Sequence, residues 1–212
     1  MSLVDVIVLA VLQGFAELLP VSSSAHVIVA EKLMGLDPSS PPMTLLLVML
    51  HTGTMFAVIA YFWHMWRGTY FQSFAVFKNF AGLLILATVL TGVVGEAFRG
   101  FSRSGATISA GMLAGVSKSP AETFSFALAV VLTPPVVFRE AMRLIHAQNI
   151  RGTANLTSAM FPSVLGAVLA FLAGLLALRW LSRWLEGGRW YLFGIYCLAA
   201  AAVVAGLHHV GY

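Results

Sequence analysis

Two fourteen-residue stretches decide the fold of this chain: SSSAHVIVAEKLMG at residues 22–35 and SRSGATISAGMLAG at residues 102–115. Laid on each other without a gap they agree at six positions, among them Ser22 with Ser102, Ser24 with Ser104 and Gly35 with Gly115. Each stretch follows an apolar segment that ends in charged or polar residues. The pair therefore predicts an internal repeat whose unit is a helix, a polar break and a second helix.

The composition around these stretches requires a lipid environment. Of 212 residues, 59% are hydrophobic and only 9% are charged, whereas a soluble domain carries about 25% charged residues. The net charge of +4 is too dilute for a nucleic-acid surface. The single cysteine, Cys197, excludes a disulfide framework. We therefore predict one all-α transmembrane domain over residues 1–212.

Four apolar runs are long enough to cross a bilayer, which takes about 20 residues. They cover residues 43–66, 121–143, 159–181 and 189–210. Two further segments, 3–34 and 80–115, are apolar but interrupted by the serine-containing breaks. Such breaks are tolerated at membrane depth when they are buried in protein or line a wet cavity. We expect two re-entrant helical hairpins and about four spanning helices.

The run 43–66 lies between the two hairpins and sets their relative orientation. A hairpin enters and leaves on one side, and one crossing then brings the second hairpin to the opposite side. The two breaks should meet near the midplane, as in an inverted repeat with halves at about 1–70 and 78–212. The N-termini of the half-helices that follow the breaks would favour a bound anion.

Charged and polar residues near the breaks are the candidates for function. Glu17 and Arg103 each cost at least about 2.5–3.5 kcal/mol at membrane depth, so they form either a structural ion pair or an anion site with Arg103 as a phosphate clamp. The serines could cap helices, but one cap needs one serine and a phosphate has several oxygens. This group comprises Ser22, Ser23, Ser24, Ser102 and Ser104.

The remaining candidates allow more than one interpretation. His26 is either a structural histidine or a general acid, base or nucleophile. His51 and Gln13 could line the same cavity, and Gln13 shares a helix face with Glu17. Glu96 and Arg99 either line the site or pair with each other. A Mg²⁺ ion could bridge Glu17 and a substrate phosphate.

Two motifs resemble a known family. QGFAELLPVSSSAH (13–26) and FRGFSRSGATISAGMLAGVSKSPAETFSF (98–126) are similar to the undecaprenyl-diphosphate phosphatases of the bacitracin-resistance type, whose motifs read EGxTEFLPVSSTGH and PGxSRSGAT. The resemblance covers about 1–66 and 98–210. It implies a multi-pass enzyme of the bacterial cytoplasmic membrane that converts a C55 polyprenyl diphosphate to the monophosphate carrier of cell-wall synthesis.

The resemblance also implies roles for particular residues. It implies that the matching residues bind the diphosphate and cleave its terminal phosphate with a divalent cation, Mg²⁺ or Ca²⁺; they are Glu17, Ser22, Ser23, His26, Ser102, Arg103, Ser104 and Thr107. The chain departs from the family pattern at Gln13, where the family has glutamate, and at Ala25 and Arg99. It is also shorter than the family by about two spans between residues 66 and 98.

We therefore predict a polyprenyl-diphosphate phosphatase with Glu17, Ser23, His26 and Arg103 as catalytic residues. The alternative is a lipid-phosphate translocase with weak or no hydrolysis, and a homodimer is left open. The two membrane sides of the chain hold six and four basic residues, and the side with six is predicted to be cytoplasmic. The termini and the mouth of the first hairpin would then lie outside. The six are Arg67, Lys78, Lys118, Arg179, Arg183 and Arg189, against Lys32, Arg139, Arg143 and Arg151 on the other side.

Overall fold

The computed structural model describes residues 2–97, 102–151, 156–186 and 191–209, and within them the chain folds entirely into helices and their connections. The elements in order are α1 (Leu3–Ala16), α2 (Ser23–Leu33), α3 (Pro41–Thr69), α4 (Phe74–Ala97), α5 (Arg103–Leu113), α6 (Lys118–Arg151), α7 (Leu156–Glu186) and α8 (Tyr191–His209). The expectation of an all-α membrane protein is confirmed.

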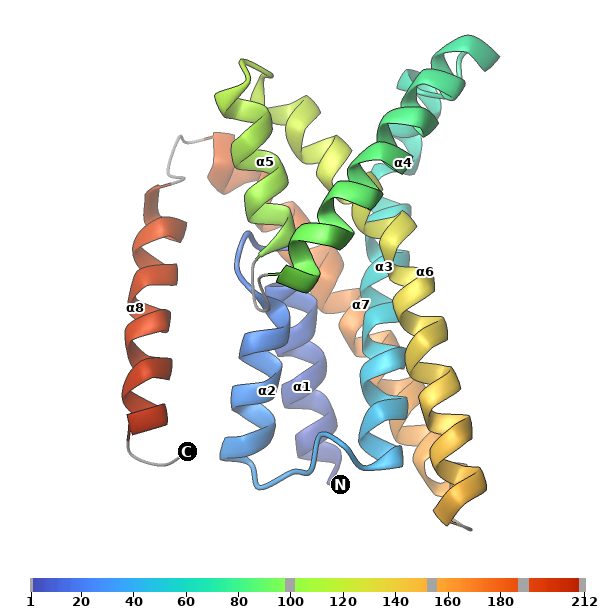
Figure 1. The fold of residues 1–212 in the computed structure, drawn as a ribbon, viewed down its shortest axis with the longest axis vertical. Coiled ribbons are helices and arrows are strands. Elements are labelled where there is room, and N and C mark those ends of the chain that lie inside the picture. Colours follow the sequence, from blue (N-terminus) through green and yellow to red (C-terminus); the bar gives the residue numbers. More distant parts are fainter. Residues whose placement is uncertain (1, 98–101, 152–155, 187–190, 210–212) are drawn as a thin grey trace.

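Helices α1 and α2 form one hairpin, α4 and α5 form a second, and the two hairpins point at each other. In Figure 1, α1 and α2 meet at mid-height and open toward the end that holds the N-terminus, while α4 and α5 open toward the opposite end. The Oγ of Ser104 lies 3.4 Å from the carbonyl oxygen of Leu19. A Cβ added to Gly105 would lie 3.2 Å from the carbonyl oxygen of Pro20. The two breaks are therefore in direct contact, as the parity argument predicted.

The second helices of the two hairpins end in the same way. Gly35 and Gly115 have φ values of 68° and 85°, the left-handed conformation that favours glycine. After each glycine, the next amide reaches back to a carbonyl five residues earlier, Leu36 to Glu31 and Val116 to Gly111, at 2.9 Å in both cases. This is the Schellman ending of a helix. The repeat seen in the sequence therefore corresponds to a repeated local structure.

Small residues let α1 and α3 each pack closely against α7. A Cβ on Gly14 would lie 2.5 Å from the Cβ of Ala173, and one on Gly53 would lie 2.2 Å from the carbonyl oxygen of Ala167. Neither glycine can carry a side chain without moving α7. This close approach brings the C-terminal end of α1 beside His51 in the interior of α3, where the candidate site lies.

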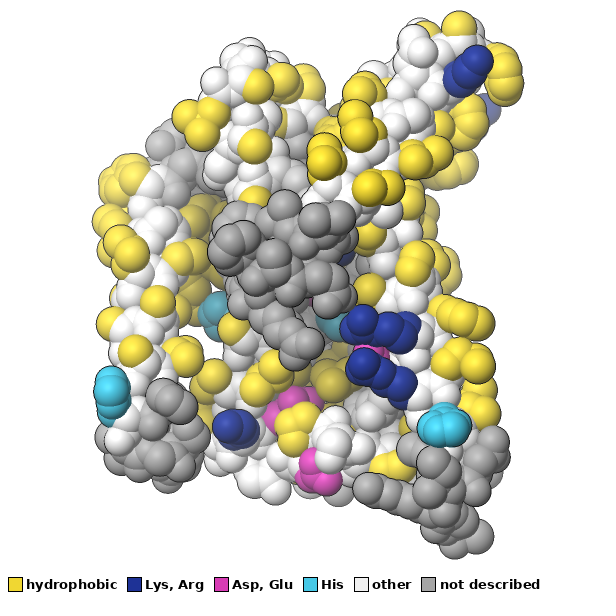
Figure 2. Space-filling view, in the orientation of Figure 1, with side chains coloured by type: hydrophobic (Ala, Val, Ile, Leu, Met, Phe, Trp, Pro, Cys, Tyr) yellow, Lys and Arg dark blue, Asp and Glu magenta, His cyan; other side chains and the backbone are white. Residues whose placement is uncertain are grey.

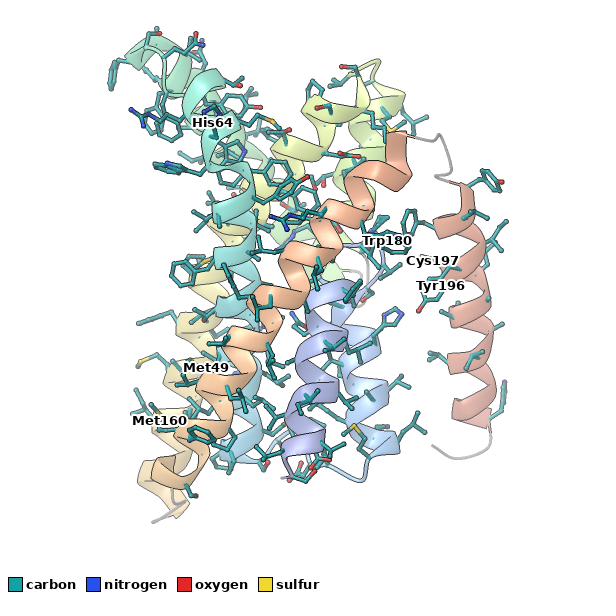
Figure 3. The ribbon with its side chains drawn as sticks, turned by 180° about the vertical axis from the view of Figure 1, so that it is seen from behind. Met49, His64, Met160, Trp180, Tyr196 and Cys197 are labelled. Carbon is teal, nitrogen blue, oxygen red and sulfur yellow. The ribbon has the colours of Figure 1, made fainter. Side chains whose placement is uncertain are left out.

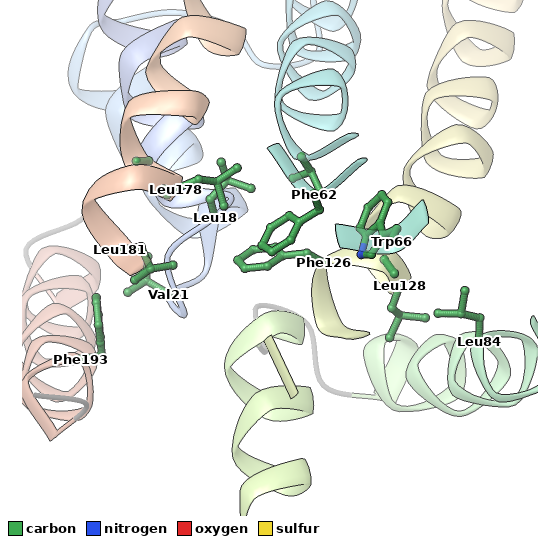
Figure 4. Packing of buried hydrophobic residues seen from close by; sticks show 14 residues of the cluster. Leu18, Val21, Phe62, Trp66, Leu84, Phe126, Leu128, Leu178, Leu181 and Phe193 are labelled. Carbon is green, nitrogen blue, oxygen red and sulfur yellow. The ribbon is translucent and has the colours of Figure 1, made fainter. Parts of the chain in front are cut away.

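An apolar cluster fixes the position of the first break. Leu18 and Val21, which flank Pro20, are buried with Phe62 of α3, Phe126 of α6 and residues of α7. Figure 4 shows the stacked rings of Phe62 and Phe126 beside them, with ring centroids 5.2 Å apart. The break is thus held by packing from three long helices, so the polar residues around it occupy defined positions.

The spanning helices differ in part from the sequence prediction. Four described segments are long and apolar enough to cross a membrane: Pro41–Thr69, Phe74–Thr91, Lys118–His146 and Ser158–Leu181. Of the predicted run 189–210, the structure describes an apolar part, Tyr191–Gly206, that is shorter than a span. In the second hairpin, α4 begins at Phe74, before the start near residue 80 that the sequence suggested.

Lys78 lies near the start of α4, where the amphipathic stem of a lysine can lie along apolar surface while its charge reaches water. Hydrophobic side chains are spread over most of the helices on the face seen in Figure 2. Leu113 and Phe74 are 90% and 81% exposed. Such side chains are suited to lipid rather than to water.

Candidate active site

Glu17 is the centre of the candidate site. It is the C-cap residue of α1 and lies at the first break, with a side chain only 16% exposed. Its Oε2 accepts hydrogen bonds from Ser23 Oγ at 2.5 Å and from Gln13 Nε2 at 3.0 Å. Its Oε1 lies 3.5 Å from Nη2 of Arg103, which comes from the other hairpin. The carboxylate therefore joins three of the predicted site residues.

The local sequence explains this arrangement. Four residues separate Gln13 from Glu17, so both side chains lie on one face of α1. Pro20 cannot donate a backbone hydrogen bond and helps to end the helix. The chain then turns, and Ser23 begins α2 close enough to reach back to Glu17. The N-cap residue Ser22 makes no side-chain capping bond, so the first amides of α2 have no hydroxyl cap.

Gln13 links the carboxylate to His51 of α3. The amide nitrogen of Gln13 lies 3.0 Å from Glu17 Oε2 and 2.6 Å from His51 Nδ1. A carboxylate held beside Arg103 is an acceptor, so the NH₂ group of the amide must face it. In the neutral tautomer of His51 with its proton on Nε2, the same group can donate to Nδ1. Nδ1 of His51 also lies 3.7 Å from Oε2 of Glu17.

The second hairpin supplies Arg103 and a set of hydroxyls. Ser102 caps α5 by accepting a hydrogen bond from the amide of Gly105, so the capping interpretation holds for this serine. Ser104 contacts the first break through Leu19. Thr107 lies 2.6 Å from Ser125 of α6, a buried serine that the sequence did not single out. Arg103 is thus the residue of this hairpin that reaches Glu17.

His26 lies at the edge of the site rather than on Glu17. Its hydrogen bonds go to the carbonyl oxygen of Ser22 and to the hydroxyl of Tyr196 in α8. Ser24 is exposed and lies 3.3 Å from Ser22, Oγ to Oγ. Tyr196 was missed by the sequence, because an isolated tyrosine in an apolar helix has no pattern that marks it as part of a site.

The structure bears differently on the two remaining predicted residues and on the predicted cation. Glu96 and Arg99 lie outside the residues whose side chains the structure describes. Among the described residues, no three His, Cys, Asp or Glu side chains come together. Within the described part of the chain, a divalent cation at Glu17 would find one carboxylate, already engaged by donors and flanked by the positive Arg103. The described donors therefore do not by themselves fit a bound cation.

The fold and the site together define an integral membrane protein with a carboxylate, a hydroxyl and an arginine enclosed where two opposed hairpins meet. Comparison with protein families gives the particular class. The family model described as bacitracin resistance protein BacA matches residues 6–99 and 96–203. The chain belongs to this family.

Relatives across several bacterial groups share nearly the whole chain. A protein of Acinetobacter baylyi named undecaprenyl-diphosphatase 2 is 48% identical, over 96% of this chain and 97% of the relative. One of the same name from Burkholderia orbicola is 30% identical over 97% of each chain. An undecaprenyl-diphosphatase of Rhodopirellula baltica is 28% identical over 96% of this chain and 97% of its own. The first alignment extends over 277 positions, more than the 212 residues here, so the relative carries a stretch without a counterpart.

Proposed function

We propose that this protein hydrolyses a polyprenyl diphosphate of the undecaprenyl type to the lipid monophosphate and inorganic phosphate. The observation that carries the proposal is the contact of Ser23 Oγ with Glu17 Oε2 at 2.5 Å, beside Arg103 from the opposed hairpin. A hydroxyl paired with a base, and a base oriented by a third group, is the arrangement of an activated nucleophile. The names of the relatives support the same substrate.

The contacts assign a role to each group. Glu17 takes the proton of Ser23, whose Oγ attacks the terminal phosphorus; the new Oγ–P bond forms as the bond to the bridging oxygen breaks and the lipid monophosphate leaves. Water then attacks the phosphoserine, phosphate departs, and Ser23 Oγ recovers its proton from Glu17. Gln13 keeps Glu17 in place through both steps. Most of the rate gain would come from positioning and charge stabilisation.

The two half-helix N-termini support binding of the diphosphate. Both α2 and α5 begin at the contact between the breaks (Figure 1), and the amides at a helix N-terminus favour phosphate. Arg103 adds a planar guanidinium that can pair with two phosphate oxygens. Its side chain is 31% exposed, so it keeps surface available for a ligand while it contacts Glu17.

The apolar exterior places this reaction in a membrane, and we infer that it is the bacterial cytoplasmic membrane. The six-to-four distribution of basic residues favours the end of the molecule at the top of Figure 1, where α5 turns into α6, as cytoplasmic. The termini and the mouth of the first hairpin would then face outward. Cysteine-accessibility labelling from either side of intact cells tests this orientation.

The nucleophile can be tested with the Ser23→Ala variant. Purified protein in detergent is supplied with polyprenyl diphosphate, and released phosphate is measured. We expect Ser23→Ala to lose at least about 10²-fold in rate, and terminal-labelled phosphate to be trapped on wild type but not on the variant. Ser109→Ala, on an exposed position of α5, is the matched control and should keep its rate. Equal rates for Ser23→Ala and the control would contradict the assignment.

The competing function is a lipid-phosphate translocase. Two opposed hairpins that meet inside the molecule are an arrangement that transporters use, and Gln13 leaves Glu17 as the one carboxylate of the first hairpin close to its break. The same assay separates the two functions. Binding of polyprenyl diphosphate without any release of phosphate, together with its movement across a vesicle bilayer, would favour the translocase.

A further inference from the structure

The ring of His26 is fixed on both of its nitrogen atoms. Nδ1 lies 2.5 Å from the carbonyl oxygen of Ser22. A carbonyl oxygen can only accept, so Nδ1 carries a proton. Among the described residues, the contacts of His26 include no carboxylate that would favour the cation. In the neutral form of this ring the lone pair is consequently on Nε2.

The lone pair of His26 meets a phenol from the far end of the chain. Nε2 lies 2.5 Å from the hydroxyl oxygen of Tyr196, so in the neutral form of His26 the hydroxyl donates to the ring. The two rings are also stacked, with centroids 5.6 Å apart and planes at 12°. Figure 3 shows Tyr196 directed from α8 toward the body of the molecule. A carbonyl, an imidazole and a hydroxyl thus form a chain in which the imidazole is a base oriented by a third group.

One face of α8 brings Tyr196 to this position. Phe193 is only 8% exposed and belongs to the apolar cluster around the first break. Cys197 lies 3.9 Å, Sγ to O, from the carbonyl of Pro20 in the same break. Phe193, Tyr196 and Cys197 are three and four residues apart, which is one helix face. The docking of α8 is consequently directed at the first hairpin, whereas Leu198 on its other side is 75% exposed.

The hydrolysis described above lacks one proton acceptor. In the second step Glu17 returns its proton to Ser23, so it cannot also take the proton of the attacking water. His26 follows Ser23 by three residues on α2, which makes the two side chains neighbours on the helix surface. A base beside the phosphoserine is therefore available, and its lone pair is reached through the hydroxyl of Tyr196, which is itself partly exposed.

We propose that Tyr196 and His26 together form the base for the water that hydrolyses the phosphoserine. Water gives a proton to the oxygen of Tyr196 as the hydroxyl proton of Tyr196 passes to His26 Nε2. The new bond between water oxygen and phosphorus forms, the bond from Ser23 Oγ to phosphorus breaks, and Oγ takes the proton held by Glu17. The imidazolium of His26 afterwards returns its proton to solvent. Tyr196 would then be a catalytic residue supplied by α8, and this role rests on the proposed function.

The Tyr196→Phe variant tests the base, because it removes the hydroxyl and keeps the stacked ring. We expect the first product, lipid monophosphate, to appear in a rapid burst of one equivalent, while steady release of phosphate falls about 10²-fold. Labelled phosphate should accumulate on Ser23. The matched control is Tyr191→Phe, which makes the same change at a 65% exposed position at the start of α8. His26→Ala should also accumulate phosphoserine, since it removes the acceptor itself.

The outcomes separate this inference from the proposed function. If Tyr196→Phe turns over as fast as wild type and Tyr191→Phe, and accumulates no more phosphoserine than they do, the role of Tyr196 is overturned. The proposed hydrolysis would be unaffected by that result. A slower first step in Tyr196→Phe, with no burst, would also overturn it and would assign the tyrosine to substrate binding. No hydrolysis by wild type would overturn both proposals. Thermal denaturation of each variant in detergent checks that the fold is retained.

Discussion

The two hairpins share a scaffold but supply different chemistry. Residues at equivalent positions begin α2 and α5, Ser23 in one and Arg103 in the other, and both contact Glu17. The first hairpin is packed tightly against α3 and α7, and it contributes the carboxylate and the hydroxyl. The second begins with α4, whose spanning segment is only 11% buried, and it contributes the guanidinium of Arg103. A duplicated fold has therefore given an asymmetric site.

The difference in packing matches the difference in chemistry. Glu17 and Ser23 must hold a short hydrogen bond, and the residues beside them, such as Leu18 at 2% exposure, leave little freedom. The guanidinium of Arg103, which would bind phosphate, tolerates more variation in distance, because the Coulomb interaction falls slowly with separation. The rigid hairpin is thus the one that carries the proposed proton transfer.

Among changes in the second hairpin, the largest effect is expected for Arg103→Lys. Lysine keeps the charge but loses the planar fork that pairs with two oxygens. We expect the rate of phosphate release to fall about 10²-fold, which is typical for loss of one preorganised donor to a developing charge. The thermal midpoint in detergent should stay near that of wild type. A full rate in this variant, with the fold intact, would show that Arg103 is a structural partner of Glu17.

A smaller effect, on stability, should separate the two hairpins by their packing. Gly14→Ala forces a Cβ to 2.5 Å from that of Ala173, so we expect a loss of about 1–3 kcal/mol from overpacking. Gly82→Ala makes the same change in α4, where a Cβ meets nothing within 4 Å. Its thermal midpoint should be unchanged or slightly higher, because alanine favours helix. Equal losses in the two variants would contradict the assignment of the first hairpin as the rigid one.

Much of this arrangement could be predicted from the sequence. The serine-containing breaks, separated by one crossing, indicated opposed hairpins, and the cost of Glu17 and Arg103 in lipid indicated that they lie together. The contact of His26 with Tyr196 could not be predicted, since the two residues are 170 positions apart and α8 has an ordinary apolar sequence.

The position of Gln13 shows the limit of motif comparison. The family pattern gives a glutamate there, and the sequence identified the loss of one carboxylate. Only the structure shows that the amide of Gln13 bridges Glu17 and His51. A substitution that removes a charge has introduced a hydrogen-bond bridge, and this bridge depends on a residue of α3 that no motif contains.

The most direct test of the account is the rate of phosphate release by Glu17→Gln beside wild type. The amide is nearly isosteric and can still contact Ser23, so the fold and the binding of polyprenyl diphosphate should be retained. It cannot take the proton of Ser23, and we expect release to fall by about 10³-fold or more. Hydrolysis at the wild-type rate by Glu17→Gln would contradict the claim that the meeting point of the two hairpins is the active site.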